Sequence, residues 1–156
     1  IFSIYFFSRY KKLSFLYLCD LVSVVAPIGL FLGRIANFIN TELIGRPTEF
    51  YISVIYPSID NIPRHPSQLY EAFFEGLILF IILISNFLRN RDTKNFGALS
   101  GIFLLNYGIF RFFIEYLREP DAHLGLIFNF VTMGQLLCLP LLFFGILLIY
   151  YNAKKK

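Results

Sequence analysis

A polar stretch at residues 33–48 combines arginine with asparagine at a spacing that suits anion binding. If it is helical, Arg34, Asn37 and Thr41 share one face, because residues three and four apart are neighbours on a helix. A guanidinium presents a planar fork of donors that meets a phosphate or carboxylate in two bonds. Asn40 adds further neutral donors and acceptors, and Gly45 would let the backbone come close to a ligand.

A second polar stretch leads into an apolar segment. Pro66 is a favourable first residue for a helix, and on that helix Gln68, Glu71 and Glu75 would fall on one face. Glu75 would then lie about 12–15 Å along the helix, at about 1.5 Å per residue. A carboxylate at that depth in lipid faces water or a charged partner. We therefore expect an arginine on another helix to pair with Glu75.

A third stretch places charges on a segment otherwise rich in phenylalanine and leucine. Arg111 and Glu115 are four residues apart, and Arg118 follows about one turn later. Such a stripe is costly against lipid, so it predicts a polar cavity, and Pro120 is expected to end the helix. Gln135, about one turn into the last apolar segment, is a weaker candidate for closing the same cavity.

The composition indicates that these side chains are positioned by a membrane protein. Of the 156 residues, 57% are hydrophobic and 15% charged, whereas soluble domains have about one half and one quarter. Four apolar segments approach the length of about 20 residues that a bilayer requires, and lipid favours helices there. They are residues 15–32, 69–88, 97–117 and 131–151. Residues 1–8 read as the end of a fifth helix, so we predict one all-α, polytopic membrane domain over residues 1–156 whose N-terminal helices are missing.

Basic residues are divided unequally between the gaps that separate these segments. All six lysines and three arginines fall on one side if each segment spans once, which marks that side, with the C-terminus, as cytoplasmic. The other side has no lysine, and its arginines are Arg34, Arg46, Arg64, Arg111 and Arg118. This set suggests bidentate contacts that lysine cannot make. A structural alternative, compatible with the first, is ion pairing with the glutamates, namely Glu42, Glu49, Glu71, Glu115 and Glu119.

The longest gap, residues 33–66, lies on the arginine side. Loops of this length are usually functional or disordered, and its middle, residues 50–62, reads as a short strand or coil at the membrane interface. The net charge of +4 is spread between apolar runs, so nucleic-acid binding is not predicted. Cys19 and Cys138 lie in apolar surroundings that favour buried thiols, and no metal-ligand spacing occurs.

In their order along the chain, these stretches resemble the prolipoprotein diacylglyceryl transferase family. The resemblance rests on Gly-Arg-x-x-Asn-Phe-x-Asn-x-Glu followed by Gly-Arg, on His-Pro-Ser-Gln-Leu-Tyr-Glu, on Tyr-Gly-x-x-Arg-Phe with Arg-Glu-Pro-Asp downstream, and on Met-Gly-Gln. They begin at Gly33, His65, Tyr107 and Met133. Each motif alone is modest, whereas the ordered set covers nearly the whole chain and is specific.

The resemblance implies transfer of a diacylglyceryl group from phosphatidylglycerol to the lipobox cysteine of a prolipoprotein, in the bacterial cytoplasmic (inner) membrane and without a metal or cofactor. It implies catalytic roles for Arg34, Asn37 and Arg111, with the arginines neutralising the leaving phosphate. His65 is a candidate acceptor of the thiol proton; a histidine of the family's N-terminal motif and the field of the arginines are alternatives. The implied substrate-binding residues are Arg34, Asn40, Glu42, Gly45, Arg46, Glu115 and Arg118.

The chain departs from the family pattern in two ways. Ala36 and Thr41 stand where the family usually has glycine, Ile44 stands where it has an aromatic residue, and Thr41 is expected to tighten a site that admits lipid. The family's N-terminal His-Gly-Gly motif and essential tyrosine are not in this chain. Two other interpretations therefore stay open: an inactive truncated remnant of the enzyme, and a membrane lipid or anion transporter, although no inverted repeat is visible.

Overall fold

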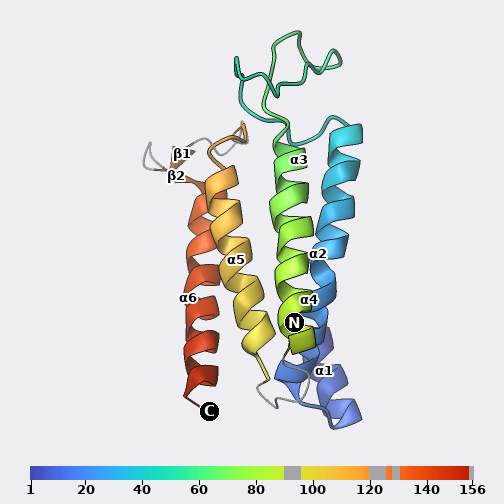
Figure 1. The fold of residues 1–156 in the computed structure, drawn as a ribbon, viewed down its shortest axis with the longest axis vertical. Helices are drawn as coiled ribbons and strands as arrows, with labels where there is room; N and C mark the ends of the chain where they lie inside the picture. The colour runs from blue at the N-terminus through green and yellow to red at the C-terminus, as the bar shows by residue number, and fades with distance from the viewer. Residues whose placement is uncertain (90–95, 120–125, 128–130, 155–156) are drawn as a thin grey trace.

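The computed structural model describes residues 1–89, 96–119, 126–127 and 131–154 of the chain. Its long helices lie side by side and alternate in direction (Figure 1). They are α1 (Phe2–Lys11), α2 (Phe15–Ile39), a continuous rod of α3 (Ser67–Glu71), the π-helix η1 (Ala72–Ile78) and α4 (Leu79–Arg89), then α5 (Ala98–Ile114) and α6 (Met133–Ala153). A short antiparallel pair, β1 (Leu126–Ile127) and β2 (Val131–Thr132), precedes α6. The fold is an all-α bundle.

Among the described residues, three helices are long and apolar enough to cross a membrane. They are α2, the rod Ser67–Arg89 and α6, with 25, 23 and 21 residues. Helix α5 is apolar but shorter, at 17 residues. The prediction of a polytopic all-α membrane protein is confirmed, with three such helices and one shorter helix in place of four of similar length. Residues predicted to be the end of a fifth helix lie in α1.

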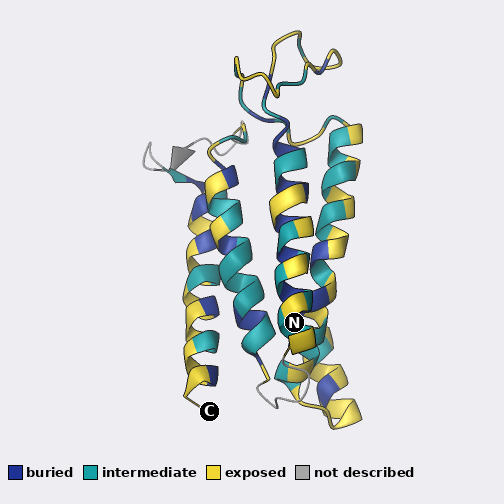
Figure 2. Cartoon of the chain, viewed as in Figure 1, coloured by how far each residue is buried: buried dark blue, intermediate teal, exposed yellow. Residues whose placement is uncertain are grey.

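Apolar and polar side chains are distributed as expected for a membrane-embedded chain. Figure 2 shows exposed residues along the outer faces of the helices, and these include large apolar side chains such as Phe113 and Phe143. By contrast, Gln68, Glu71 and Glu75 are fully buried. Because charged groups are costly against lipid, they gather where helices face one another. The interior is therefore organised by polar contacts as well as by apolar packing.

Small residues allow close helix packing on two sides of the bundle. A Cβ at Gly76 would lie 2.6 Å from Cβ of Phe31, so η1 approaches α2 closely at this point. Between α5 and α6 the same role falls to Gly101, Gly108 and Gly145, where an added Cβ would meet the facing helix at 2.8–3.0 Å. Small residues at such crossings are typical of membrane helices, because close packing drives their association in lipid.

Asp20 of α2 holds the start of α5. Gly97, which precedes α5, offers no side-chain cap and has a φ of 98°. Both carboxylate oxygens of the buried Asp20 accept hydrogen bonds there, at 2.7 Å from the Gly97 N–H and 2.7 Å from the Ser100 N–H. The Ser100 hydroxyl donates to the same carboxylate. A residue of one helix thus satisfies the free N–H groups of another, as a local cap usually does.

The loop at residues 40–66 is attached to the chain that follows α5. Isolated bridges pair Gly45 with Arg118 and Val54 with Arg64, and the Arg46 N–H donates to the Leu117 carbonyl at 2.9 Å. The buried Arg64 donates to the Gly45 carbonyl at 3.1 Å and to the carboxylates of Asp60 and Glu119. Its hydrogen bonds to Asp60 lower the pKa of that carboxyl. The predicted short strand or coil is therefore a fixed loop, which defines the loop end of the bundle.

Two helix boundaries differ from those predicted. Helix α2 continues from residue 32 to Ile39, so Arg34 and Asn37 lie within it and Thr41 lies beyond it. Helix α5 ends at Ile114 instead of residue 117, because the Leu117 carbonyl pairs with the loop and the chain leaves the helix there. Pro120, predicted to end this helix, lies outside the described residues.

Candidate functional site

Six charged side chains meet at the loop end, where α2, the α3–η1 rod and α5 converge. We call this group the charged cluster. Its members are Arg34 of α2, Glu71 of α3, Glu75 of η1, Arg111 of α5, and Glu115 and Arg118 of the segment after α5. Three positive and three negative charges give the cluster a formal charge of zero. The expectation that Glu75 pairs with an arginine on another helix is confirmed, and in fact it faces two.

Glu71 joins arginines from two helices. Its Oε1 lies 2.6 Å from Nη1 of Arg111, and its Oε2 lies 2.8 Å from Nε of Arg34. The Arg34 N–H does not point at the carboxylate oxygen, so this second contact is an ion pair without an aligned hydrogen bond. Arg118 is farther away, at 3.9 Å from Oε1. Glu71 therefore fixes the spacing between Arg34 and Arg111.

Glu75 supports the same two arginines one turn farther along the rod. Its oxygens lie 3.5 Å from Arg34 and 3.7 Å from Arg111. The π-helical segment, Ala72–Ile78, begins directly after Glu71. Such segments are rare and frequent at functional sites. Here the segment keeps both glutamates buried between α2 and α5 while Gly76 packs against α2.

The carboxylates lie deeper than the guanidinium groups. The side chains of Glu71 and Glu75 are 0% exposed, whereas those of Arg34, Arg111 and Arg118 are 15%, 12% and 11% exposed. Glu71 and Glu75 are thus fully covered, whereas parts of the three guanidinium groups remain accessible. This layered arrangement suits an anionic group that remains at the surface of the cluster.

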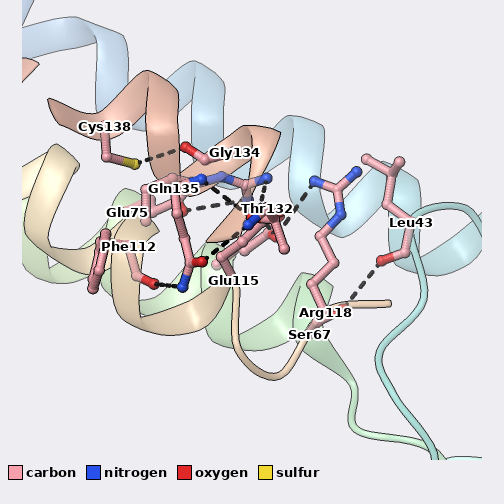
Figure 3. A network of polar contacts seen from close by, with 12 residues as sticks. Leu43, Ser67, Glu75, Phe112, Glu115, Arg118, Thr132, Gly134, Gln135 and Cys138 are labelled. Atoms are coloured by element: carbon pink, nitrogen blue, oxygen red, sulfur yellow. Dashed lines mark hydrogen bonds and ion pairs between the residues drawn. The ribbon is translucent and has the colours of Figure 1, made fainter. Parts of the chain in front are cut away.

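Helix α6 supports the cluster from behind (Figure 3). The Thr132 hydroxyl donates to Oε1 of Glu115 at 3.0 Å, and Oε2 of Glu115 lies 2.9 Å from Nη2 of Arg111. Thr132 also caps α6, accepting from the Gln135 N–H at 3.2 Å while the Gln135 side chain accepts from the Thr132 N–H. A Cβ at Gly134 would overlap the Glu115 carboxylate, so a larger residue there would displace that carboxylate. Gln135 is buried and also donates to the Phe112 carbonyl at 3.5 Å, and its closing of a polar cavity stays a prediction.

The other predicted polar residues of α2 and the following turn lie outside these ion pairs. The Asn37 carbonyl accepts from the Glu42 N–H at 2.9 Å, and within the described residues its side-chain amide has no hydrogen-bond partner. Asn40 and Glu42 are exposed. The Glu42 carbonyl accepts from the buried Gln68 side chain at 2.6 Å. Substrate contacts by these three residues stay a prediction.

Gly45 and Arg46 connect the loop to the segment that carries Arg118. A Cβ at Gly45 would overlap the carbonyl oxygen of His65, so glycine is required for this close contact. The Arg46 guanidinium donates to the Arg118 carbonyl at 2.9 Å, and the Arg46 carbonyl accepts from the His65 N–H at 3.0 Å. These contacts place Arg118 beside the cluster. Direct contact of Gly45 or Arg46 with a substrate stays a prediction.

His65 lies in an apolar pocket rather than in the charged cluster. The pocket has a volume of about 320 Å³ and is lined by Phe50, Ile52, His65, Tyr70, Phe74, Ile114 and Leu117. Within the described residues, the His65 imidazole faces Phe50 and the Tyr70 hydroxyl, which is 3.5 Å from Nδ1. Tyr70 and Glu71 project from different faces of the same helix. The His65 side chain is therefore not part of the ion pairs of the charged cluster that the structure describes.

Thr41 has an unfavourable backbone conformation. Its φ is 56°, in the left-handed region that β-branched residues rarely adopt. Leu43, two residues later, has a φ of 55°. The turn after α2 is thus built for glycine at position 41, where the family pattern has it, and threonine carries a conformational cost there. The substitution strains the turn, whereas the sequence suggested only a tighter site.

Comparison with known proteins shows the family to which the chain belongs. The family model for prolipoprotein diacylglyceryl transferase matches residues 1–151. The chain belongs to this family. It is 54% identical over 151 residues to the phosphatidylglycerol–prolipoprotein diacylglyceryl transferase of Rickettsia akari (strain Hartford), an alignment covering 97% of this chain and 58% of that relative. It is 55% identical over 145 residues to the protein of the same name from Rickettsia bellii (strain OSU 85-389), covering 93% and 55%. The chain spans little more than half the length of these relatives.

The transferase-family motifs account for most of the cluster, and the structure adds contacts that the motifs did not predict. Arg34, Arg111, Glu115 and Arg118 were predicted and lie together. Glu71 ends the motif that begins at His65 and was among the glutamates considered for ion pairing, but helical spacing did not predict its position between two arginines. No separate role was predicted for Thr132 at the start of the last segment, although a threonine three residues before glutamine is the sequence signal of a capping box.

Proposed function

We propose that this chain forms the membrane domain of a phosphatidylglycerol–prolipoprotein diacylglyceryl transferase. Family membership supports the proposal, and the observation that carries it is the convergence of Arg34 and Arg111 on the buried Glu71. The two guanidinium groups come from different helices and lie over buried carboxylates, at the loop end of the bundle. That is a suitable place for the phosphodiester of a lipid whose acyl chains remain between helices.

The proposed reaction is displacement at the glycerol carbon that bears the phosphate ester. A cysteine thiolate of the prolipoprotein forms the new carbon–sulfur bond, and the carbon–oxygen bond to phosphate breaks. The electron pair passes to the phosphate oxygen, and glycerol 1-phosphate leaves. Arg34 and Arg111 stabilise the charge that develops on the leaving group. The thiol proton goes to a base or to solvent, and His65, beside the apolar pocket, is our candidate within the chain.

The proposal includes an orientation in the bacterial cytoplasmic membrane. Arg9, Lys11, Lys12 and Arg89 lie at the opposite end of the bundle from the charged cluster (Figure 1). Basic residues of short loops favour the cytoplasmic side. We therefore place the C-terminus in the cytoplasm and the charged cluster near the outer surface, where a lipoprotein precursor presents its cysteine.

A transfer assay tests the function. The chain alone, and a chimera in which the N-terminal part of the Rickettsia akari relative precedes Ile1, would be incubated with phosphatidylglycerol vesicles and a peptide that contains a lipobox cysteine. We expect thioether-linked diacylglycerol on the peptide and release of glycerol 1-phosphate in at least the chimera. A cysteine-to-serine peptide is the control. If a folded chimera releases no product, the chain is not the catalytic domain that we propose.

A further inference from the structure

The hydroxyl group of Thr132 makes two hydrogen bonds, one as an acceptor and one as a donor. The hydroxyl oxygen accepts from the Gln135 N–H and so caps α6, while the hydroxyl hydrogen is directed to Glu115 at 3.0 Å. Helix capping needs only an acceptor at this position. The donation to Glu115 is therefore separate from the capping role, and it involves a buried carboxylate of the charged cluster.

Glu115 connects Thr132 to Arg111. One of its oxygens receives the Thr132 hydroxyl, and the other lies 2.9 Å from Nη2 of Arg111. The start of α6 packs tightly behind this carboxylate, because even a Cβ at Gly134 would overlap it. One oxygen of Glu115 is thus held by the Thr132 hydroxyl, and the other forms an ion pair with Arg111 that lacks an aligned hydrogen bond. Figure 3 shows Thr132, Glu115 and Gly134 grouped in this way.

We propose that Thr132 is a positioning residue for Arg111, acting through Glu115. The inference rests on the proposed function insofar as Arg111 contacts the lipid phosphate. Without the Thr132 donor, Oε1 of Glu115 loses a hydrogen bond, and the carboxylate is free to turn away from the position in which it pairs with Arg111. Misplacement of a substrate-binding group by about 1 Å costs up to about a hundredfold in rate. The Thr132 hydroxyl, a neutral hydrogen-bond donor, thus sets the position of the Arg111 guanidinium.

Three substitutions separate positioning from helix capping. Thr132→Ser keeps both the acceptor and the donor. Thr132→Asp keeps a favourable cap but has no hydrogen to donate and adds a negative charge beside Glu115. Thr132→Val removes both functions. Thermal unfolding in detergent micelles would show which variants keep the helix, and we expect Thr132→Asp to remain folded.

The first test follows Arg111 itself and needs no activity. The chain in micelles would be treated with phenylglyoxal, a reagent for guanidinium groups, and the rate of Arg111 modification would be measured by peptide mass spectrometry. We expect a rate increase of several-fold in Thr132→Asp and Thr132→Val and an unchanged rate in Thr132→Ser. Arg9, at the other end of the bundle, is the internal control. An unchanged rate at Arg111 in folded Thr132→Asp would overturn the proposal.

The second test uses the form of the protein that transfers diacylglyceryl groups. We expect Thr132→Asp to lower kcat about tenfold or more, and Thr132→Ser to restore it to the wild-type value. In a Glu115→Gln background, Thr132→Asp should have little further effect, because the two residues act in series. A normal kcat in Thr132→Asp would contradict the proposal, because it would mean that Thr132 acts only as a helix cap. Absence of activity in the unmodified protein would count against the proposed function and leave the modification test intact.

Discussion

The carboxylate of Glu71 stands between two arginines of different helices, with Oε1 at 2.6 Å from Nη1 of Arg111. This contact links the α3–η1 rod to α5 inside a membrane bundle. A buried ion pair of this kind is weak evidence for stability, because its desolvation offsets much of its attraction. Its role is better explained as holding the guanidinium groups of Arg34 and Arg111 in a fixed arrangement. Several expected outcomes follow from that view.

Replacement of Arg111 by lysine should remove most transfer activity while the fold is kept. Lysine retains the charge but cannot present two parallel donors to a phosphate, nor contact Glu71 and Glu115 at the same time. Loss of one such donor costs about 10²–10³-fold in kcat. Arg9→Lys is the matched control, because Arg9 lies in the last turn of α1. Near-normal turnover by a folded Arg111→Lys protein would exclude the bidentate contact.

Replacement of Glu71 by glutamine should separate binding from turnover. The cluster would change from neutral to a formal charge of +1, so KM for phosphatidylglycerol should fall or stay constant. At the same time kcat should fall about tenfold or more, because Arg34 and Arg111 lose their common partner. Glu49→Gln removes the same charge from an exposed loop position and should change neither value. A variant with unchanged kcat would show that the spacing of the arginines is set by other residues.

Replacement of Gly45 by alanine should destabilise the loop end. The new Cβ would overlap the His65 carbonyl, and relief of that overlap requires the loop to move away from Arg64 and Arg118. Overpacking of this kind costs about 1–3 kcal/mol. Gly29→Ala in α2 is a direct comparison, because nothing lies within 4 Å of its added Cβ. Thermal unfolding in micelles should show a lower midpoint for Gly45→Ala only, and equal midpoints would refute the close contact.

Replacement of Thr41 by glycine should stabilise the protein. Glycine adopts the φ of 56° without strain, and the gain is about 1 kcal/mol or more. Thr41→Ala serves as the control, since alanine loses the hydroxyl contact with Ser58 at 3.3 Å but keeps the Cβ. The unfolding midpoint should rise in the glycine variant and not in the alanine variant. Equal effects of both would mean that backbone strain at this position is unimportant.

The sequence was informative about elements and less so about their contacts. Apolar runs interrupted by charges predicted the helices of the bundle, because lipid leaves few alternatives for the backbone. Helical spacing also placed Arg111 and Glu115 on one face. It did not reveal that α5 ends at Ile114, because that end depends on pairing of Leu117 and Arg46 across more than 70 positions of sequence.

The least predictable features come from close approach between helices. Asp20 interrupts the first apolar segment and its spacing indicates no role, yet it caps α5. His65 was expected to accept the thiol proton; it lines an apolar pocket beside the charged cluster's helices, and that role stays a prediction. Both outcomes depend on the rotation and depth of one helix against its neighbour. Periodicity along a single helix does not determine either quantity.

The most direct test of the central claim is a double-mutant cycle on Arg34 and Arg111. The transfer assay would give kcat/KM for phosphatidylglycerol in Arg34→Lys, Arg111→Lys and the double variant, with the unfolding midpoint of each as a control. If both guanidinium groups bind one phosphate, the double variant should lose far less than the product of the two single losses, because either substitution already breaks the shared contact. Fully multiplicative losses in folded proteins would mean that the two arginines act independently, and would contradict a common phosphate site.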